Sequence, residues 1–171
     1  MRITELNGTE CRELLARQGG GRIACARDNQ PYIVPIYFAA EGDNLYCFAT
    51  LGQKIEWMRA NPLVCIQADE IHGPASWKSV VVFGRYEELA EDAEHEQSRR
   101  HAITLFAKHE SWWSGAYAAQ QVRKGGEPRP VIFCVHMTQL TGQRADADAA
   151  EVAMEIAQSF PGTASQDRQK R

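Results

Sequence analysis

A glycine turn at the start of a predicted helix carries the residues best suited to chemistry. Thr50, Gly52 and Lys54 stand where an apolar β-type run changes to a helical pattern. The first backbone N–H groups of a helix have no partner within the helix, and the helix dipole places positive charge there. Lys54 adds a full positive charge and Thr50 a hydroxyl donor. The stretch therefore favours an anion, and we interpret it as a phosphate site for a nucleotide-like cofactor.

The spacing of this turn differs from that of the common nucleotide-binding motifs. It is neither a GxxxxGK[ST] Walker loop nor a GxGxxG fingerprint. The alternative interpretation is that Gly52 makes a tight turn and that Lys54 is a solvated residue of the first helical turn. Local features alone leave both interpretations open.

The strand that precedes this turn is apolar on both of its faces. One face carries Tyr32, Val34, Ile36 and Phe38, and the other carries Ile33, Pro35 and Tyr37. Both faces should therefore be covered. Pro35 cannot donate a ladder hydrogen bond, which predicts a sheet edge or a bulge at that point. An edge would leave backbone groups free for a planar polar ring, or it would be covered by a neighbouring chain, and the two can coexist.

Hydrophobic periodicity and turn residues predict the remaining elements. The predicted strands span residues 22–27, 32–38, 45–50, 63–67, 79–89 and 131–141. The predicted helices span residues 7–17, 91–109, 111–124 and 146–158, with a two-turn helix between Gly52 and Asn61. Six mostly antiparallel strands indicate a small β-barrel with helices packed outside it.

Several single residues should shape these elements. Asn7 and Glu10 fit a capping box at the first helix, and Asp28-Asn29-Gln30 fits a hairpin turn. Residues 69–78 are expected to form a loop, and Gly84 a bulge or barrel bend. Asp92 is expected to cap the helix over residues 91–109.

Composition limits the classes of protein to which the chain can belong. Its 171 residues suit one domain, which we place at residues 1–158, with residues 159–171 as a disordered tail. The net charge of −3 offers no basic field for nucleic acid. No apolar run approaches the roughly 20 residues of a membrane span, and the N-terminus lacks the apolar core of a signal peptide.

The cysteines and histidines indicate neither a disulfide framework nor a metal site. Five cysteines are widely spaced without a CxxC pair, which predicts reduced, mostly buried thiols in a cytoplasmic protein. No HExxH or other close metal pair is present, and no Ser-His-Asp or Cys-His arrangement is legible. His95 and His101 are expected to be solvated, whereas His136 fits a core histidine with a partner. The cysteines are Cys11, Cys25, Cys47, Cys65 and Cys134.

Several segments match a known family in their order and spacing. They are Gly21–Ala24, Pro31–Phe38, Ala49–Lys54, Asn61–Cys65 and Ser79–Arg85. Together they resemble the pyridoxamine 5′-phosphate oxidase-like FMN-binding split-barrel family, and within it the nitroimidazole-resistance and flavin-nucleotide-binding branch. The resemblance covers roughly residues 8–142. It implies a six-stranded antiparallel split β-barrel and a homodimer with FMN at the subunit interface.

The resemblance also implies a set of cofactor-binding residues. Ala49, Thr50 and Lys54 match the phosphate side of the site, and Ser79 and Val80 match the strand that borders the flavin. The strand whose backbone meets the flavin ring is matched by Val34, Pro35, Ile36 and Tyr37. The chain lacks the arginine-rich C-terminal segment with which true pyridoxamine phosphate oxidases hold their substrate, which argues against vitamin B6 oxidation.

The implied function is flavin-dependent oxidoreduction of a small molecule, with a nitroaromatic compound as the candidate substrate. The cofactor carries such chemistry, so a dedicated acid or base is not needed. The alternatives are a flavin-binding or carrier protein without turnover, a deazaflavin-binding split barrel and a haem-binding one. His72 is a candidate to approach the flavin edge. Trp112 and Trp113 are predicted to pack a helix onto the barrel or, alternatively, to form a lid over the partner's flavin.

Apolar residues on both faces of the strand over residues 79–89 also predict assembly. Val80, Val82 and Gly84 share one face, and Val81 and Phe83 share the other. One barrel has one interior, so the second face would be exposed unless two chains pair. We therefore expect dimerisation to build the flavin site, and a charge at Val82 to break it if Val82 lies outside the barrel.

Overall fold

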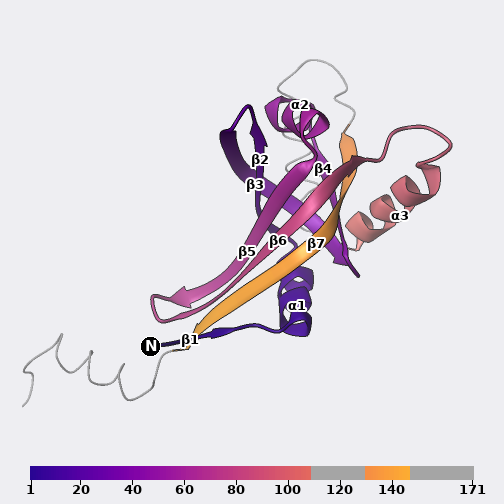
Figure 1. The fold of residues 1–171 in the computed structure, drawn as a ribbon. Coiled ribbons are helices and arrows are strands. Elements are labelled where there is room, and N and C mark those ends of the chain that lie inside the picture. Colours follow the sequence, from indigo (N-terminus) through magenta and orange to yellow (C-terminus); the bar gives the residue numbers. More distant parts are fainter. Residues whose placement is uncertain (109–129, 147–171) are drawn as a thin grey trace, which may run out of the picture.

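The computed structural model describes residues 1–108 and 130–146. Within these ranges the chain forms seven strands and three helices (Figure 1). In chain order they are β1 (Arg2–Glu5), α1 (Gly8–Gln18), β2 (Gly20–Arg27), β3 (Gln30–Glu41), β4 (Asn44–Ala49), α2 (Gln53–Ala60), β5 (Leu63–Gly73), β6 (Ser76–Glu88), α3 (Glu96–Ala107) and β7 (Val131–Asp146).

Six of the strands close into an antiparallel ring. Their order is β7-β4-β3-β2-β5-β6, and β6 pairs back onto β7. The seventh strand, β1, adds to the outer end of β7, where Arg2 lies opposite Asp146. The predicted six-stranded barrel with peripheral helices is confirmed. The sequence did not predict β1, because it is short and exposed and its partner lies at the far end of the chain.

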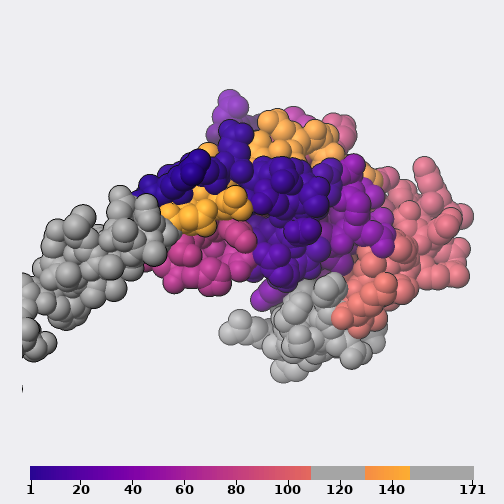
Figure 2. Space-filling view, turned by 90° about the horizontal axis from the view of Figure 1, so that it is seen from below, coloured from indigo at the N-terminus to yellow at the C-terminus, as the bar shows by residue number. Residues whose placement is uncertain are grey.

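The helices close the barrel and cover part of its outside. α1 and α2 lie at opposite ends, and α3 lies against the outer side of the sheet (Figure 1). Seen from the α1 end, the N-terminal residues in indigo cover the barrel beside β7 in orange (Figure 2). Ile55 and Met58 of α2 are fully buried in the main core. A second, smaller core beneath α3 contains Ala39, Leu89, Ala102, Leu105, Phe106, Ile132 and Cys134.

Local signals at the start of the chain operate as expected. The Asn7 side chain accepts hydrogen bonds from the backbone of Thr9 and Glu10, and the Glu10 carboxylate accepts one from the backbone of Asn7. This capping box begins α1. Asp28 and Asn29 adopt positive φ angles of 52° and 63°, as a two-residue hairpin turn between β2 and β3 requires.

The bulge expected at Gly84 is also confirmed. The register of β6 against β7 shifts between Phe83 and Gly84. A Cβ on Gly84 would lie 2.6 Å from Val135 Cγ1 and 2.7 Å from the His136 carbonyl oxygen. Only glycine allows β7 to approach so closely at this bend.

The loop predicted over residues 69–78 is wrong. β5 and β6 pair as far as Gly73 and Ser76, so the turn contains only Pro74 and Ala75. The turn signal at Gly73-Pro74 marks only the tip of a long hairpin that projects beyond the barrel (Figure 1). Backbone pairing holds the hairpin together, Ile71 lies opposite Trp77 in its ladder, and Glu70 pairs with Arg17 of α1.

The predicted start of α3 also needs correction. The helix begins at Glu96 and not at Asp92. Asp92 Oδ1 instead accepts hydrogen bonds from the backbone N–H and the ring Nδ1 of His95, at 2.9 and 2.8 Å. It therefore closes the turn that precedes the helix.

Some predictions lie outside the described residues. They are the helix over residues 111–124 with Trp112 and Trp113, the helix beyond Asp146, the tail over residues 159–171 and His109. None of the helices within residues 1–108 and 130–146 combines the length and apolar character that a membrane crossing requires.

Candidate cofactor site

The barrel is split between β3 and β4. These strands pair only where Phe38–Glu41 lies opposite Asn44–Cys47. From Gln30 to Tyr37, β3 pairs with β2 on one side and with no described strand on the other. The edge predicted from Pro35 is therefore confirmed, and it borders the split.

The other side of the split is the end of β4. If the ladder continued in the register of Phe38 and Cys47, Ala49 would face Ile36 and Thr50 would face Pro35. Instead Ala49 pairs only with Val131 of β7, and the chain turns from Thr50 into α2. The predicted ring-binding strand and the predicted phosphate residues thus flank the same interruption of the sheet.

Contacts from both strands of the β2–β3 hairpin, close to its turn, hold α2 in place. The Asn61 side chain donates a hydrogen bond to the Ala26 carbonyl oxygen at 3.0 Å. The rings of Tyr32 and Trp57 pack with their centroids 5.6 Å apart. The helix begins after Gly52, and no side chain of the described residues caps its N-terminus. Its first backbone donors are therefore available to a ligand.

Lys54 is a half-buried cation beside this uncapped helix end. Burial lowers the pKa of its ammonium group, and the titratable groups that act on it are the thiols of Cys47 and Cys25. Burial raises the pKa of both thiols, so they are neutral and supply no counter-charge. Among residues 1–108 and 130–146, no carboxylate forms an ion pair with Lys54. These features fit a phosphate group, which would supply the missing negative charge.

Several predicted site residues offer their backbone rather than their side chain. Val80 is fully buried inside the barrel, and Ile36 and Ala49 are buried as well. Pro35 and Tyr37 point to the exposed outer face of β3. Their positions agree with a strand that meets a ring through its main chain.

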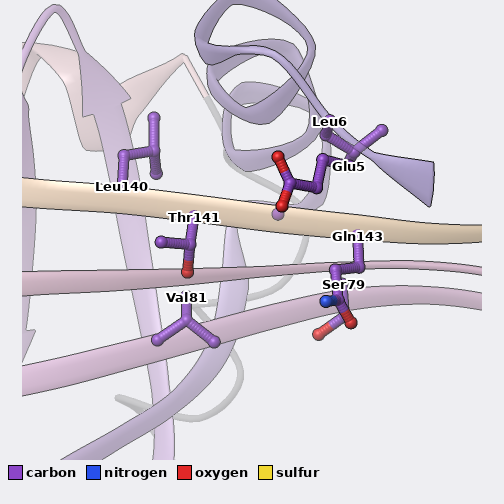
Figure 3. Close-up of a pocket in the computed structure, with 8 residues that line it drawn as sticks. Glu5, Leu6, Ser79, Val81, Leu140, Thr141 and Gln143 are labelled. Carbon is purple, nitrogen blue, oxygen red and sulfur yellow. The ribbon is translucent and has the colours of Figure 1, made fainter.

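Ser79 lies on the outer face of the sheet in a shallow groove. Ser79 and Val81 enter it from β6, Thr141 and Gln143 from β7, and Glu5 and Leu6 from the end of β1 (Figure 3). Its volume is about 480 Å³. The groove and β3 share this outer face, since Pro35, Arg22, Gln67 and Val81 follow one another across β3, β2, β5 and β6.

Sequence reasoning missed a polar cluster beside Ser79. Gln67 Nε2 donates to Asp69 Oδ2 at 2.6 Å and to Ser79 Oγ at 3.2 Å. Arg22 Nη1 lies 3.6 Å from the same Asp69 oxygen. The available signal was a polar residue at every second position of a β-type run, but the loop predicted from Asp69 onward concealed it.

The described histidines do not join the site. His72 lies near the tip of the β5–β6 hairpin with its ring Nε2 2.9 Å from Glu70 Oε1, and it is not among the residues that line the groove. His101 pairs with Glu41 and His136 with Glu87, and His95 contacts Asp92. Within the described residues no group of three or more His, Cys, Asp or Glu side chains could hold a metal ion.

The family model described as pyridoxamine 5′-phosphate oxidase matches residues 7–144. The chain therefore belongs to the pyridoxamine 5′-phosphate oxidase-like split-barrel family. An uncharacterized protein of Rhizobium meliloti (strain 1021) is 42% identical over 148 residues, which are 86% of this chain and 98% of that protein.

Two solved structures are similar to this one. A FAD-binding protein of Mesorhizobium loti is 41% identical and superposes with a TM-score of 0.70 over 86% of this chain and 99% of its own. A 5-nitroimidazole antibiotic resistance protein of Bacteroides thetaiotaomicron shares the fold at 24% identity, with a TM-score of 0.60 over 85% of this chain and 92% of its own.

Proposed function

We propose that this protein is a homodimeric flavoprotein that binds FMN and uses it as an oxidoreductase for a small, nitroaromatic-type substrate. The observation that carries the proposal is Lys54, a half-buried cation at the start of α2, where the described residues supply neither a carboxylate partner for it nor a side-chain cap for the helix. Thr50 and the first N–H groups of α2 would hold the phosphate together with Lys54. The free edge of β3 would meet the ring through the backbone groups of Val34 to Tyr37.

Bound flavin would supply the transfer of hydride or electrons, which needs no acid or base from the chain. The role of the chain is then to bind, orient and shield the ring. Pro35 has no N–H, so at that residue the β3 edge offers only a carbonyl acceptor. The N–H groups of Val34 and Ile36 point into the ladder with β2, as that of Phe38 does toward the Gly19 carbonyl oxygen, so the outward backbone groups of this stretch are those of Pro35 and Tyr37.

The related Mesorhizobium loti protein is described as FAD-binding. FMN and FAD share the flavin ring and its first phosphate. We favour FMN because a terminal phosphate monoester carries nearly two charges at neutral pH and suits one helix end with one lysine. A bridging phosphate of FAD carries a single charge and continues into an adenosine group that needs a site of its own.

A second copy of this chain is the proposed partner. Large apolar side chains are exposed on one outer face of β3, β5 and β6, more than isolated surface residues would explain. Pairing about a two-fold axis would cover this face and enclose a flat cofactor. The residues are Ile33, Tyr37, Leu63, Ile71 and Phe83.

We also place the protein in the cytoplasm. All five cysteines are free, and four of them are buried. Unpaired thiols are the usual state in a reducing compartment.

Titration of the purified protein with FMN, FAD and riboflavin tests the proposal. We expect FMN to bind most tightly and riboflavin, which lacks the phosphate, to bind on the order of 10- to 100-fold more weakly. Lys54→Met should lose most of that difference, whereas Lys108→Met, which changes an exposed lysine at the end of α3, should keep it.

Two results would overturn the proposal: absence of flavin binding, or equal FMN affinity of the wild type and Lys54→Met. Tighter binding of FAD than of FMN would change the proposed cofactor to FAD and leave the proposed class, a flavoprotein, unchanged. Reduction of a nitroaromatic acceptor with NADH or NADPH separates an enzyme from a flavin carrier. A Soret band in the protein as purified would indicate haem instead.

A further inference from the structure

The polar cluster beside the groove fixes the orientation of one amide group. A carboxylate only accepts hydrogen bonds, so the Gln67 atom that lies 2.6 Å from Asp69 Oδ2 must be the nitrogen. The second hydrogen of that nitrogen is directed to Ser79 Oγ. Arg22 holds the Asp69 carboxylate from the other side. The amide of Gln67 is therefore held against rotation by two acceptors.

This orientation leaves one acceptor and one donor uncommitted. Gln67 Oε1 receives no hydrogen bond from the residues that the structure describes. Ser79 Oγ already accepts from Gln67, so its hydroxyl hydrogen must be donated elsewhere, and no acceptor for it occurs within the described ranges. An oriented acceptor and an oriented donor thus stand side by side on the outer face of β5 and β6.

The surrounding backbone makes this pair rigid. A Cβ on Gly21 would lie only 2.2 Å from the backbone carbonyl oxygen of Gln67, so β2 and β5 approach each other closely at this residue. Gln67 lies opposite Val81, which lines the groove together with Ser79 (Figure 3). Preorganised polar groups beside the apolar side chain of Val81 suit a flat ring with polar edges.

We propose that Arg22 and Asp69 act as positioning residues, and that Gln67 and Ser79 then recognise the imide edge of the flavin pyrimidine ring. Gln67 Oε1 accepts from the flavin N3–H, and the Ser79 hydroxyl donates to a neighbouring carbonyl oxygen. This rests on the proposed flavin function but not on the phosphate site at Lys54. It places the pyrimidine end of the cofactor at Gln67 and Ser79, whereas the start of α2 is the proposed place of the phosphate.

A cofactor analogue that lacks only the imide hydrogen tests the assignment. 3-Methyl-FMN keeps the phosphate and the ring but cannot donate from N3. The wild type should bind FMN at least about tenfold more tightly than 3-methyl-FMN, the value of one hydrogen bond in a partly buried site. Gln67→Leu and Asp69→Ala should bring this ratio toward one while keeping the preference for FMN over riboflavin.

Gln139→Leu is the matched control. Gln139 lies opposite Phe83 on the same outer face, is exposed, and has no hydrogen bond to another described residue. Its substitution should leave the ratio unchanged. If Gln67→Leu does not fold, Ser79→Ala removes the donor with less disturbance. The ¹⁵N chemical shift of N3 in bound, labelled FMN then reports the hydrogen bond directly, since a purely structural role would not change it.

The outcomes separate this inference from the proposed function. Equal binding of FMN and 3-methyl-FMN by the wild type overturns the imide assignment and leaves flavin binding intact. Absence of flavin binding overturns both. Uridine monophosphate carries the same imide edge without the flavin rings, and tighter binding of it than of FMN would assign the pair to a pyrimidine nucleotide and overturn the flavin assignment.

Discussion

Lys54 gives the proposed phosphate site a dependence on pH. Burial lowers its pKa from 10.5, and only the protonated form attracts a phosphate. The preference for FMN over riboflavin should therefore decline as pH rises through the lowered pKa, below 10.5. Comparing the two dissociation constants across alkaline pH measures this, because deprotonation of the flavin ring affects both ligands equally. A Lys54→Met protein should show a small preference that does not vary with pH, and a decline retained in that variant would place the titrating group elsewhere.

The cysteines differ in accessibility but share a low reactivity. Burial raises the pKa of all five thiols, that of Cys134 to about 12, and only Cys65 is partly exposed. Since the thiolate is the reactive species, native protein should react slowly with a thiol reagent, and first at Cys65. Mass spectrometry of partly labelled protein identifies the site, and Cys65→Ser should abolish the early label. Rapid labelling of Cys47 in native protein would contradict its burial in the core.

At the scale of elements, one ion pair joins α2 to the sheet. The Arg59 guanidinium makes two hydrogen bonds of 2.7 Å to the Glu88 carboxylate, which also accepts one from the Tyr86 hydroxyl. The hydrogen bonds from Arg59 hold the pKa of Glu88 below its ordinary value of 4.5. This stability is present above pH 4.5 and is lost as pH falls through the lowered pKa.

Glu88→Gln should therefore cost about 1 kcal/mol of unfolding free energy at neutral pH, because Arg59 is half exposed and solvent screens the pair. The cost should vanish in acid, below the pKa of folded Glu88. Denaturant unfolding at both pH values measures it. Glu96→Gln is the control, since its exposed pair with Arg100 lies within one helix and should change stability little. An equal cost in acid would show that the pair is not its source.

The elements that sequence predicted are those with a local physical cause. The positive φ angles at Asp28 and Asn29, the missing N–H of Pro35 and the bend at Gly84 each follow from the chemistry of a single residue. The hairpin beyond Asp69 escaped prediction because partners across the ladder stabilise it, and no apolar pattern marks it. β1 escaped for the same reason, since its only strand partner lies at the end of β7.

The residues of the candidate site also differ in whether the sequence could predict them. Lys54 could be predicted because a helix start and a lysine lie within a few residues of each other. The hydrogen bonds of Gln67 to Asp69 and Ser79 could not, because Ser79 comes from another strand and its register was unknown. When residues come together only through strand pairing, their contacts can be inferred only after the strand order and register are known.

At the scale of the whole molecule, the outer face of β6 should decide assembly. A charge at Val82 would test pairing only if Val82 lay outside the barrel. Val82 is fully buried inside the barrel, so its substitution does not serve as that test. Phe83 is the outward residue, 45% exposed. We expect Phe83→Glu to give a monomer that has lost its flavin, because a charge would be buried in the interface.

Sedimentation velocity measures mass, and absorbance at the flavin band measures occupancy in the same experiment. Ile103→Glu is the control, since Ile103 is equally apolar and 51% exposed but lies on α3, away from this face. A wild-type monomer with full flavin occupancy would refute the dimeric site.

The place of β7 in the chain bears on how the protein is made. β7 pairs with β1, β4 and β6, and among the described strands it comes last in the chain. A nascent chain that has not yet released residue 131 from the ribosome therefore has two open sheet edges and an unpaired first strand. Such edges are sites of association between chains, and contacts so distant in sequence form slowly. The barrel should thus close only once residues 131–146 have left the ribosome, and crowded polysomes should be the place where it aggregates.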